Sequence, residues 1–478
     1  MSCVQLWAII PELIVAGLGL ALVPVAGVAK GRWQQVPVWV AAVGLLAAMA
    51  FTVRMLPWQS QAVFCETYAL DGFGNVFKLL ILLGAFLSLL AINGHFRGTG
   101  KEGHAAIALL FSTLGGMLVS SSLDLGLIIL FFQMLSLASY MLVTLIRKDR
   151  RANEATIKYF IYAAVALAVM AYGLTFLYGL TGSLELRTIG QALGGADKLW
   201  VAVAFGMILI GYAFEITAVP FHFWAPDVYS GTTAPVAGYL SVVPKIAGFA
   251  AFLRFLLLAL PDGMAAWPLT VAVLAALTMT LGNLAALRQT RLKKLLAYSS
   301  IAQAGYVLMA VAVAGRVESA FSATGYYLAA YLFMNLGAFV VVAQLERLTG
   351  TDHINGLRGL GRRAPFAAAA LALSLLSLAG VPPLAGFAGK VLLLEATLSD
   401  GLVWLVVIAA LNFAVALYYY LMPMVEMYLK EPEVQLRLPN RPGYVIPLSI
   451  SVLGTLLIGV FPSLALGVTR YLGELLGG

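Results

Sequence analysis

Long apolar segments alternate with short polar connections along the whole chain. Each apolar segment has at least the ~20 residues that an α-helix needs to cross the hydrocarbon core of a bilayer. The period-two alternation of a membrane β-barrel is absent. The sequence therefore predicts an all-α integral membrane protein with about fourteen transmembrane helices, at residues 6–28, 36–56, 74–93, 104–122, 124–146, 156–180, 199–224, 234–260, 266–287, 294–314, 319–345, 366–396, 401–429 and 443–470.

Composition agrees with this pattern and limits the chemistry that the chain can perform. Of its 478 residues, 62% are hydrophobic and 10% are charged, whereas soluble proteins average about 25% charged residues. The connections are too short to fold into a domain that holds a flavin, an iron–sulfur cluster or a nucleotide. Phosphate-loop and dinucleotide motifs are absent from the sequence, and the four histidines lack metal-ligand spacing. We therefore expect no cofactor in this chain.

The net charge of +8 indicates a membrane orientation and does not indicate a nucleic-acid partner. Most basic residues lie in the odd-numbered connections, including 147–151 and 358–363. By the positive-inside rule these connections face the cytoplasm, so both termini are predicted on the opposite side. Cys3 and Cys65 are then both on the outer side, where a disulfide is conceivable but two isolated thiols are more often unpaired.

Three ionisable residues interrupt apolar segments: Glu215 in 199–224, Lys245 in 234–260 and Lys390 in 366–396. An ionised side chain at the centre of a bilayer costs at least ~2.5–3.5 kcal/mol. These residues therefore indicate an internal polar path for ions or protons. The alternative for each lysine is snorkelling to an interface, which suits Lys78 near the start of its segment better than Lys245 or Lys390.

Pro220 and Pro382-Pro383 are expected to interrupt two of the same segments, which lie five segments apart. An odd offset reverses orientation, so we expect two inverted five-helix repeats, each with a broken helix. The predicted organisation is helices 1–3 in residues 1–103, repeats in 104–260 and 266–429, and a last helix in 443–478. Two ordinary proline kinks are the alternative interpretation.

Several motifs resemble one family along the whole chain. They are PELI at 11–14, EATIKYF at 154–160, PFHFWAPDVYSG at 220–231, LLAYSSIAQAGY at 295–306 and GVPPLAGFAGK at 380–390. Their sequence and order resemble the subunit N family of bacterial respiratory complex I (NADH–quinone oxidoreductase), the counterpart of mitochondrial subunit 2. The resemblance implies a proton-translocating subunit in the bacterial inner membrane, with both termini periplasmic. It also implies partner membrane-arm subunits, and places NADH, FMN, iron–sulfur clusters and quinone in partner subunits.

In that family a glutamate on the fifth span pairs with a lysine on the seventh, and lysines on the eighth and twelfth spans continue a hydrated axis. Lys245 and Lys390 match the last two positions. Gln133 stands where the family has the glutamate, and Glu215 where it has the paired lysine. A glutamine beside a neutral glutamate has the same net charge as the lost ion pair, zero. The resemblance leaves both a rewired proton relay and a disabled half-channel open.

Other polar residues are weaker candidates. Glu154 and Lys158 are spaced as a helix-surface pair or mark an inner proton entrance. His222 and Asp227 line an access route or serve a turn and a helix cap. Glu395 belongs to the exit side or meets lipid headgroups. Tyr418–Tyr420 are packing residues or a hydroxyl relay.

Three alternatives remain for the function. The chain could be the same subunit in a related complex with another electron donor, a free-standing cation or proton transporter, or a structural spacer whose channel has decayed. Co-purifying chains would separate a complex subunit from a free transporter.

Overall fold

The computed structural model describes residues 5–57, 60–145, 150–260, 266–432 and 441–475, and most of them are α-helical. The first ten helices are α1 (Ile10–Val28), α2 (Val36–Met55), α3 (Gly72–Phe96), α4 (Glu102–Ser121), α5 (Leu125–Val143), α6 (Arg150–Thr181), α7 (Leu186–Ala192), α8 (Lys198–Glu215), α9 (Trp224–Gly231) and α10 (Ala234–Ala259). They are followed by α11 (Ala266–Ala286), α12 (Leu292–Val311), α13 (Ser319–Thr349), α14 (Leu360–Arg363), α15 (Pro365–Ala379), α16 (Ala385–Ser399), α17 (Val403–Leu429), α18 (Pro442–Val460) and α19 (Pro462–Thr469). A short antiparallel hairpin, β1 (Gln61–Val63) and β2 (Tyr68–Leu70), precedes α3.

The all-α membrane fold is confirmed. Within the described residues, twelve helices are long and apolar enough to cross a membrane. They account for all predicted segments except two, which coincide with α12 and with the pair α15 and α16. α12 is less apolar because it carries two lysines in its first turn and Ser299, Ser300 and Gln303 further along. The pair is a broken helix, so neither half has full length.

Both predicted breaks are present, and their backbone groups find partners inside the protein. α8 ends at Glu215 and α9 begins at Trp224, and the N–H of Val219 between them donates to Thr278 Oγ1 at 3.1 Å. α15 ends at Ala379, and Gly380 follows with φ of +90°, a conformation that favours glycine. Prolines lack an N–H and disrupt the helical ladder. Backbone freed in this way is tolerated at membrane depth only where protein or water satisfies it.

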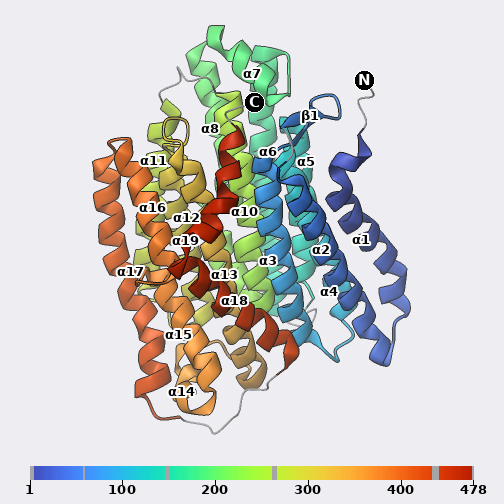
Figure 1. Cartoon of the computed structure of the whole chain (residues 1–478), viewed down its shortest axis with the longest axis vertical. Helices are drawn as coiled ribbons and strands as arrows, with labels where there is room; N and C mark the ends of the chain where they lie inside the picture. The colour runs from blue at the N-terminus through green and yellow to red at the C-terminus, as the bar shows by residue number, and fades with distance from the viewer. Residues whose placement is uncertain (1–4, 58–59, 146–149, 261–265, 433–440, 476–478) are drawn as a thin grey trace.

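Burial separates a central group of helices from a peripheral group. The apolar stretches of α10 and α13 are 89% and 94% buried, against 33% for α1, α6, α17 and α18. Figure 1 shows α3, α10 and α13 in the middle of the bundle, with α17 along one edge and α1 along the other. Polar side chains on the central helices are therefore shielded from the surface of the bundle.

The connections sort onto two sides of the bundle. The ends of the chain lie on the same side as β1 and α7, and α14 lies on the opposite side (Figure 1). This arrangement agrees with an even number of membrane crossings and with the predicted common side for both termini.

We expect cysteines introduced at positions 187 and 362 to label from opposite faces of the membrane. Arg187 and Arg362 are exposed and lie in α7 and α14. Arg187→Cys and Arg362→Cys, each made in a Cys3→Ser and Cys65→Ser background, would be treated with a membrane-impermeant maleimide on sealed vesicles of known orientation. Arg150→Cys should be labelled from the same face of the membrane as Arg362→Cys. Labelling of positions 187 and 362 from one side would contradict the topology.

Candidate functional site: a chain of buried polar side chains

Lys245 lies in the middle of α10 and is 2% exposed. Its Nζ donates to the Oγ of Ser300 at 2.5 Å and to the Ser300 carbonyl at 2.7 Å, both on α12. Tyr331 of α13 donates its hydroxyl to the same Ser300 Oγ at 2.8 Å, and its ring lies 5.9 Å from the amine. The lysine is thus held inside the protein by a neighbouring helix and does not snorkel to an interface.

Lys390 lies in α16 and is 3% exposed. Its Nζ reaches back across the break and donates to the carbonyls of Leu378 and Ala379, at 3.0 and 2.7 Å. These are the last carbonyls of α15, where a helix lacks backbone donors and carries partial negative charge. A Cβ at Gly380 would lie 2.8 Å from Lys390 Cδ, so glycine makes room for the side chain. The ring of Phe413 covers the amine at 4.4 Å.

Side chains of α12 and α17 fill the space between the two lysines. Gln303 donates to Tyr420 Oη at 3.0 Å and to the Leu378 carbonyl at 3.2 Å, and accepts from Tyr327. Tyr420 also shares a short hydrogen bond with Ser299. Hydroxyls and one amide thus extend from Leu378 to Ser299, whose neighbour in the chain, Ser300, holds Lys245.

Sequence reasoning did not single out Ser300, Gln303 or Tyr327 as site residues. Ser300 and Gln303 lie within the 295–306 motif, where two serines and a glutamine interrupt an otherwise apolar helix. That spacing puts Ser299 and Gln303 one turn apart on one face. Tyr420 belonged to a run interpreted either as packing or as a hydroxyl relay, and its bonds to Ser299 and Gln303 place it in the polar chain.

Glu215 is the last residue of α8 and is 2% exposed. It accepts a hydrogen bond from Ser136 Oγ at 3.3 Å. Gln133 is half-buried one turn before Ser136 on α5. Gly248 of α10 packs against Glu215, because a Cβ there would lie 3.3 Å from the Cβ of Glu215.

Glu215 of α8 packs against α10 close to Lys245, but the two side chains have different hydrogen-bond partners. Among the described residues no ion pair joins them. Since Gly248 and Lys245 are one turn apart on α10, Glu215 packs beside the helix turn that carries the lysine. A link through water or a polar side chain stays a prediction.

A polar pocket of about 260 Å³ brings three weaker candidates together. Lys158 of α6 pairs with Glu154 of the same helix at 2.9 Å and with Asp227 of α9 at 2.7 Å. Arg291 and Lys294 from the start of α12 line the same pocket. The pocket thus lies where α6, α9 and α12 meet.

The other two weaker candidates lie apart from this pocket. His222 is buried at 3% exposure in the break after α8, with its ring 4.5 Å from that of Phe223. Glu395 is exposed on α16. Among the described residues, neither belongs to the hydrogen-bonded groups around Lys245 and Lys390.

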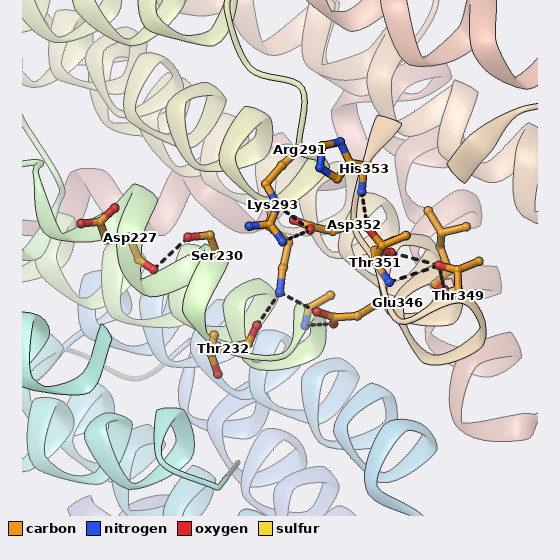
Figure 2. A network of polar contacts seen from close by, with 12 residues as sticks. Asp227, Ser230, Thr232, Arg291, Lys293, Glu346, Thr349, Thr351, Asp352 and His353 are labelled. Atoms are coloured by element: carbon orange, nitrogen blue, oxygen red, sulfur yellow. Dashed lines mark hydrogen bonds and ion pairs between the residues drawn. The ribbon is translucent and has the colours of Figure 1, made fainter. Parts of the chain in front are cut away.

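A second polar network fixes the ends of the helices that carry this chain, and it is drawn in Figure 2. Lys293 of α12 pairs with Glu346 of α13 at 2.5 Å and donates to the Thr232 carbonyl at 2.7 Å. Glu346 also accepts from the N–H of Ala234, the first residue of α10, at 2.8 Å. α10, α12 and α13 are therefore held in one register, which the contact between Lys245 and Ser300 requires.

Two further ion pairs lie inside the bundle, and they correct one prediction. Lys78 is 1% exposed and pairs with Glu12 of α1 at 3.0 Å, so its interpretation as a snorkelling residue is wrong. Arg254 of α10, which the sequence did not single out, pairs with Asp71 through two bonds of 2.8 and 3.0 Å. Because both cations are buried, each needs a carboxylate partner, and these partners come from the first part of the chain.

Arg254 connects three parts of the bundle. Besides Asp71 at the start of α3, its guanidinium donates to the Ser120 carbonyl near the end of α4, at 3.1 and 3.2 Å. It also lies 4.7 Å from the ring of Phe73. Arg254 thus joins the start of α3 and the end of α4 to the C-terminal part of α10.

The cysteine prediction is not resolved. Cys65 is exposed, and Cys3 lies outside the described residues. Their pairing therefore stays a prediction.

Known proteins share this sequence and architecture. Residues 122–415 match the family described as NADH:quinone oxidoreductase/Mrp antiporter, TM. The chain is 36% identical to NADH-quinone oxidoreductase subunit N of Trichlorobacter lovleyi, over 97% of this chain and 96% of the relative. It is 40% identical to NAD(P)H-quinone oxidoreductase subunit 2 of Thermosynechococcus vestitus, over 89% of this chain and 82% of the relative.

Solved structures give the same result. A chain of respiratory complex I from Thermus thermophilus with bound aureothin superposes with a TM-score of 0.83 at 34% identity, covering 96% of this chain and 99% of that one. A chain of the Mrp complex from Dietzia sp. DQ12-45-1b superposes with a TM-score of 0.84 at 21% identity, covering 98% and 97%. The second likeness shows the fold alone.

The ion pair between Asp71 and Arg254 yields a stability prediction. Arg254→Met leaves a buried carboxylate without its partner, so we expect a loss of about 3–5 kcal/mol. Asp71 also caps α3, because its Oδ1 accepts from the N–H of Gly74 at 2.7 Å. The double variant Arg254→Met with Asp71→Asn should be more stable than Arg254→Met alone, since the charge is gone and asparagine can keep the cap. The thermal midpoint of the purified protein in detergent measures both.

Arg362→Met is the matched control, because its pair with Glu431 is exposed at 72% and 76% and such pairs contribute about 0–1 kcal/mol. Equal losses for Arg254→Met and Arg362→Met would contradict a special role for the buried pair.

Proposed function

Because the chain belongs to the NADH:quinone oxidoreductase/Mrp antiporter family, we propose that it moves protons as the subunit N-type component of a complex I-type membrane arm. The observation that carries the proposal is a pair of buried hydrogen-bonded groups, one from Lys245 to Ser300 and one from Ser299 through Tyr420 and Gln303 to the carbonyl that Lys390 shares, which meet at adjacent serines of α12. Two amines that can gain and lose a proton lie at their outer ends, and hydroxyls lie between. Protons move along such groups without a soluble domain or a cofactor in this chain.

The polar environment of each lysine supports exchange of its proton. Lys245 is bonded to a serine hydroxyl, which can both accept and donate. Lys390 is bonded to the carbonyl end of α15, which favours its charged form. Burial opposes that charge. Because these two influences oppose each other, Lys390 can gain or lose its proton when a neighbouring charge changes.

Partner subunits supply the energy in this proposal. NADH, FMN, iron–sulfur clusters and quinone are assigned to those partners. Among the described residues no group of three or more His, Cys, Asp or Glu side chains is arranged to hold a metal ion. Quinone reduction then acts on this chain only through charge or conformational changes at its contacts with neighbouring membrane-arm subunits.

The orientation that fits this function places the basic connections in the cytoplasm and both termini in the periplasm of a bacterial inner membrane. The pocket of Glu154, Lys158 and Asp227 would then be an entrance for protons from the cytoplasm. Residues 104–260 and 266–429 would be inverted repeats, with Glu215 and Lys390 at corresponding breaks. The breaks with their ionisable residues support this arrangement.

A related complex with another electron donor is the second candidate. Its support is the 40% identity to subunit 2 of the Thermosynechococcus vestitus NAD(P)H-quinone oxidoreductase, compared with 36% to the Trichlorobacter lovleyi subunit N. Proton transfer inside the chain is the same in both cases. Purification of the intact assembly, followed by identification of its donor-binding subunits, separates them.

Lys245→Met and Lys390→Met should each lower the number of protons pumped per quinone reduced. Methionine keeps the volume of the side chain but cannot carry a proton. Loss of a proton-transfer group slows transfer by about 10²-fold or more, so the path through this subunit should close. Proton uptake by inverted vesicles, measured beside quinone reduction, gives the ratio. Normal ratios in both variants of an assembled complex would remove the lysines from the path.

Glu215 yields a separate prediction, based on its position beside the turn of Lys245. Glu215→Gln should lower the pumped protons per quinone, because the buried carboxyl that accepts from Ser136 can carry a proton and an amide cannot. Gln133→Glu combined with Glu215→Lys, the pattern of the family, should be tolerated better than Glu215→Lys alone, which buries a second amine without a carboxylate. Unchanged pumping in Glu215→Gln would make the carboxyl a bystander.

A further inference from the structure

We propose that Gln303 is a proton-blocking gate between Lys245 and Lys390, which rests on the proposed proton-transfer function. Its side chain is 2% exposed and hydrogen-bonds to Tyr327, to Tyr420 and to the Leu378 carbonyl that Lys390 also contacts. It is the one amide side chain in a described path otherwise made of hydroxyls, amines and carbonyls.

The orientation of the amide follows from its partners. The Leu378 carbonyl can only accept a hydrogen bond, so the atom of Gln303 that faces it is Nε2. The same Nε2 donates to Tyr420 Oη at 3.0 Å, and the opposite Oε1 accepts from Tyr327. Tyr420 also shares a hydrogen bond with Ser299, in which either oxygen can donate. From Tyr327 through the amide to Tyr420 the donors run in one direction.

This arrangement stops a proton at the amide. A hydroxyl accepts a proton on its lone pair and releases its own, whereas an amide N–H has no lone pair free to accept one. On the far side, Lys390 donates to two carbonyls, which have no proton to return. The hydroxyl groups around Ser300 are therefore connected to Lys245 and separated from Lys390.

The gate and Lys390 share one acceptor. Nε2 of Gln303 and Nζ of Lys390 both donate to the Leu378 carbonyl, at 3.2 and 3.0 Å. When the amide turns away from this carbonyl, the hydroxyl of Tyr420 can face a neutral Lys390 amine. Tyr420 then gives its proton to the amine and receives the proton of Ser299, and Ser299 receives the proton that a charged Lys245 gives up through Ser300 and a water molecule. One proton thus passes from Lys245 to Lys390, and each hydroxyl ends neutral. Any change in the carbonyl end of α15 alters both bonds together.

The test replaces the amide with groups that can pass a proton. An imidazole accepts on one nitrogen and donates from the other, and a carboxyl does so through its two oxygens. In the intact complex, Gln303→His should increase passive proton entry into vesicles several-fold when no electron donor is present. Gln303→Glu, which keeps the shape of glutamine, should do the same and serves if the histidine variant does not assemble. Adding Lys390→Met should abolish the increase.

Two controls separate a gate from loosened packing. Gln303→Met fills a similar volume but cannot pass a proton, so it should stay as tight as the wild type. Asn75→His replaces a buried amide on α3, bonded to the Met55 carbonyl and outside the chain between the lysines, and should also stay tight. Proton entry is followed as the decay of an imposed pH gradient, with a potassium gradient and valinomycin to clamp the potential.

Three outcomes overturn the gate: Gln303→His and Gln303→Glu both as tight as the wild type, an equal increase in Gln303→Met, or an increase that survives Lys390→Met. They differ from failure of the proposed function. If Lys245→Met and Lys390→Met lower pumping while the Gln303 variants stay tight, only the gate is wrong. If the lysine variants pump normally, the function itself is wrong.

Discussion

A membrane interior provides no water for a polar group, so each charge or broken backbone segment in this protein must find its partner within the bundle. This constraint explains features that otherwise look unrelated. The two amines of the candidate path are bonded to a serine and to a helix end, and Arg254 and Lys78 are bonded to carboxylates. Even α1, a peripheral helix, provides one of these partners, because its Glu12 is buried at 2% exposure.

The same constraint determines how the helices are joined. α12 holds Lys245 by its serine, reaches Lys390 through Gln303, and is tied to α10 and α13 by Lys293. A small shift of α12 would therefore disturb the contacts of both lysines at once. If a partner subunit drives proton transfer by displacing helices, α12 is a suitable helix to transmit the displacement. Its polar side chains can exchange their few hydrogen-bond partners only in discrete steps.

The sequence was sufficient to predict the fold class, the positions of the helical segments and the two breaks, because length, hydrophobicity and proline are local properties. It also indicated that Lys245, Lys390 and Glu215 are interior residues. It did not indicate that Lys245 bonds to Ser300 or that Gln303 separates the lysines, because partners depend on the register of helices far apart in the chain. Lys78 shows the limit: its position near a segment end suggested an interface, and only the three-dimensional position of Glu12, 3.0 Å from its amine, reveals the buried pair.

The buried pair of Asp71 and Arg254 also has a consequence for how the protein is synthesised and inserted into the membrane. The two residues are 183 positions apart, which at ~5–20 residues per second corresponds to roughly 10–40 s of synthesis. During that interval Asp71, which directly precedes α3, has been synthesised, but Arg254, which neutralises it, has not. The contact that joins α3 to α10 therefore forms only after α10 has been synthesised, so the order of translation is part of the route by which the bundle closes.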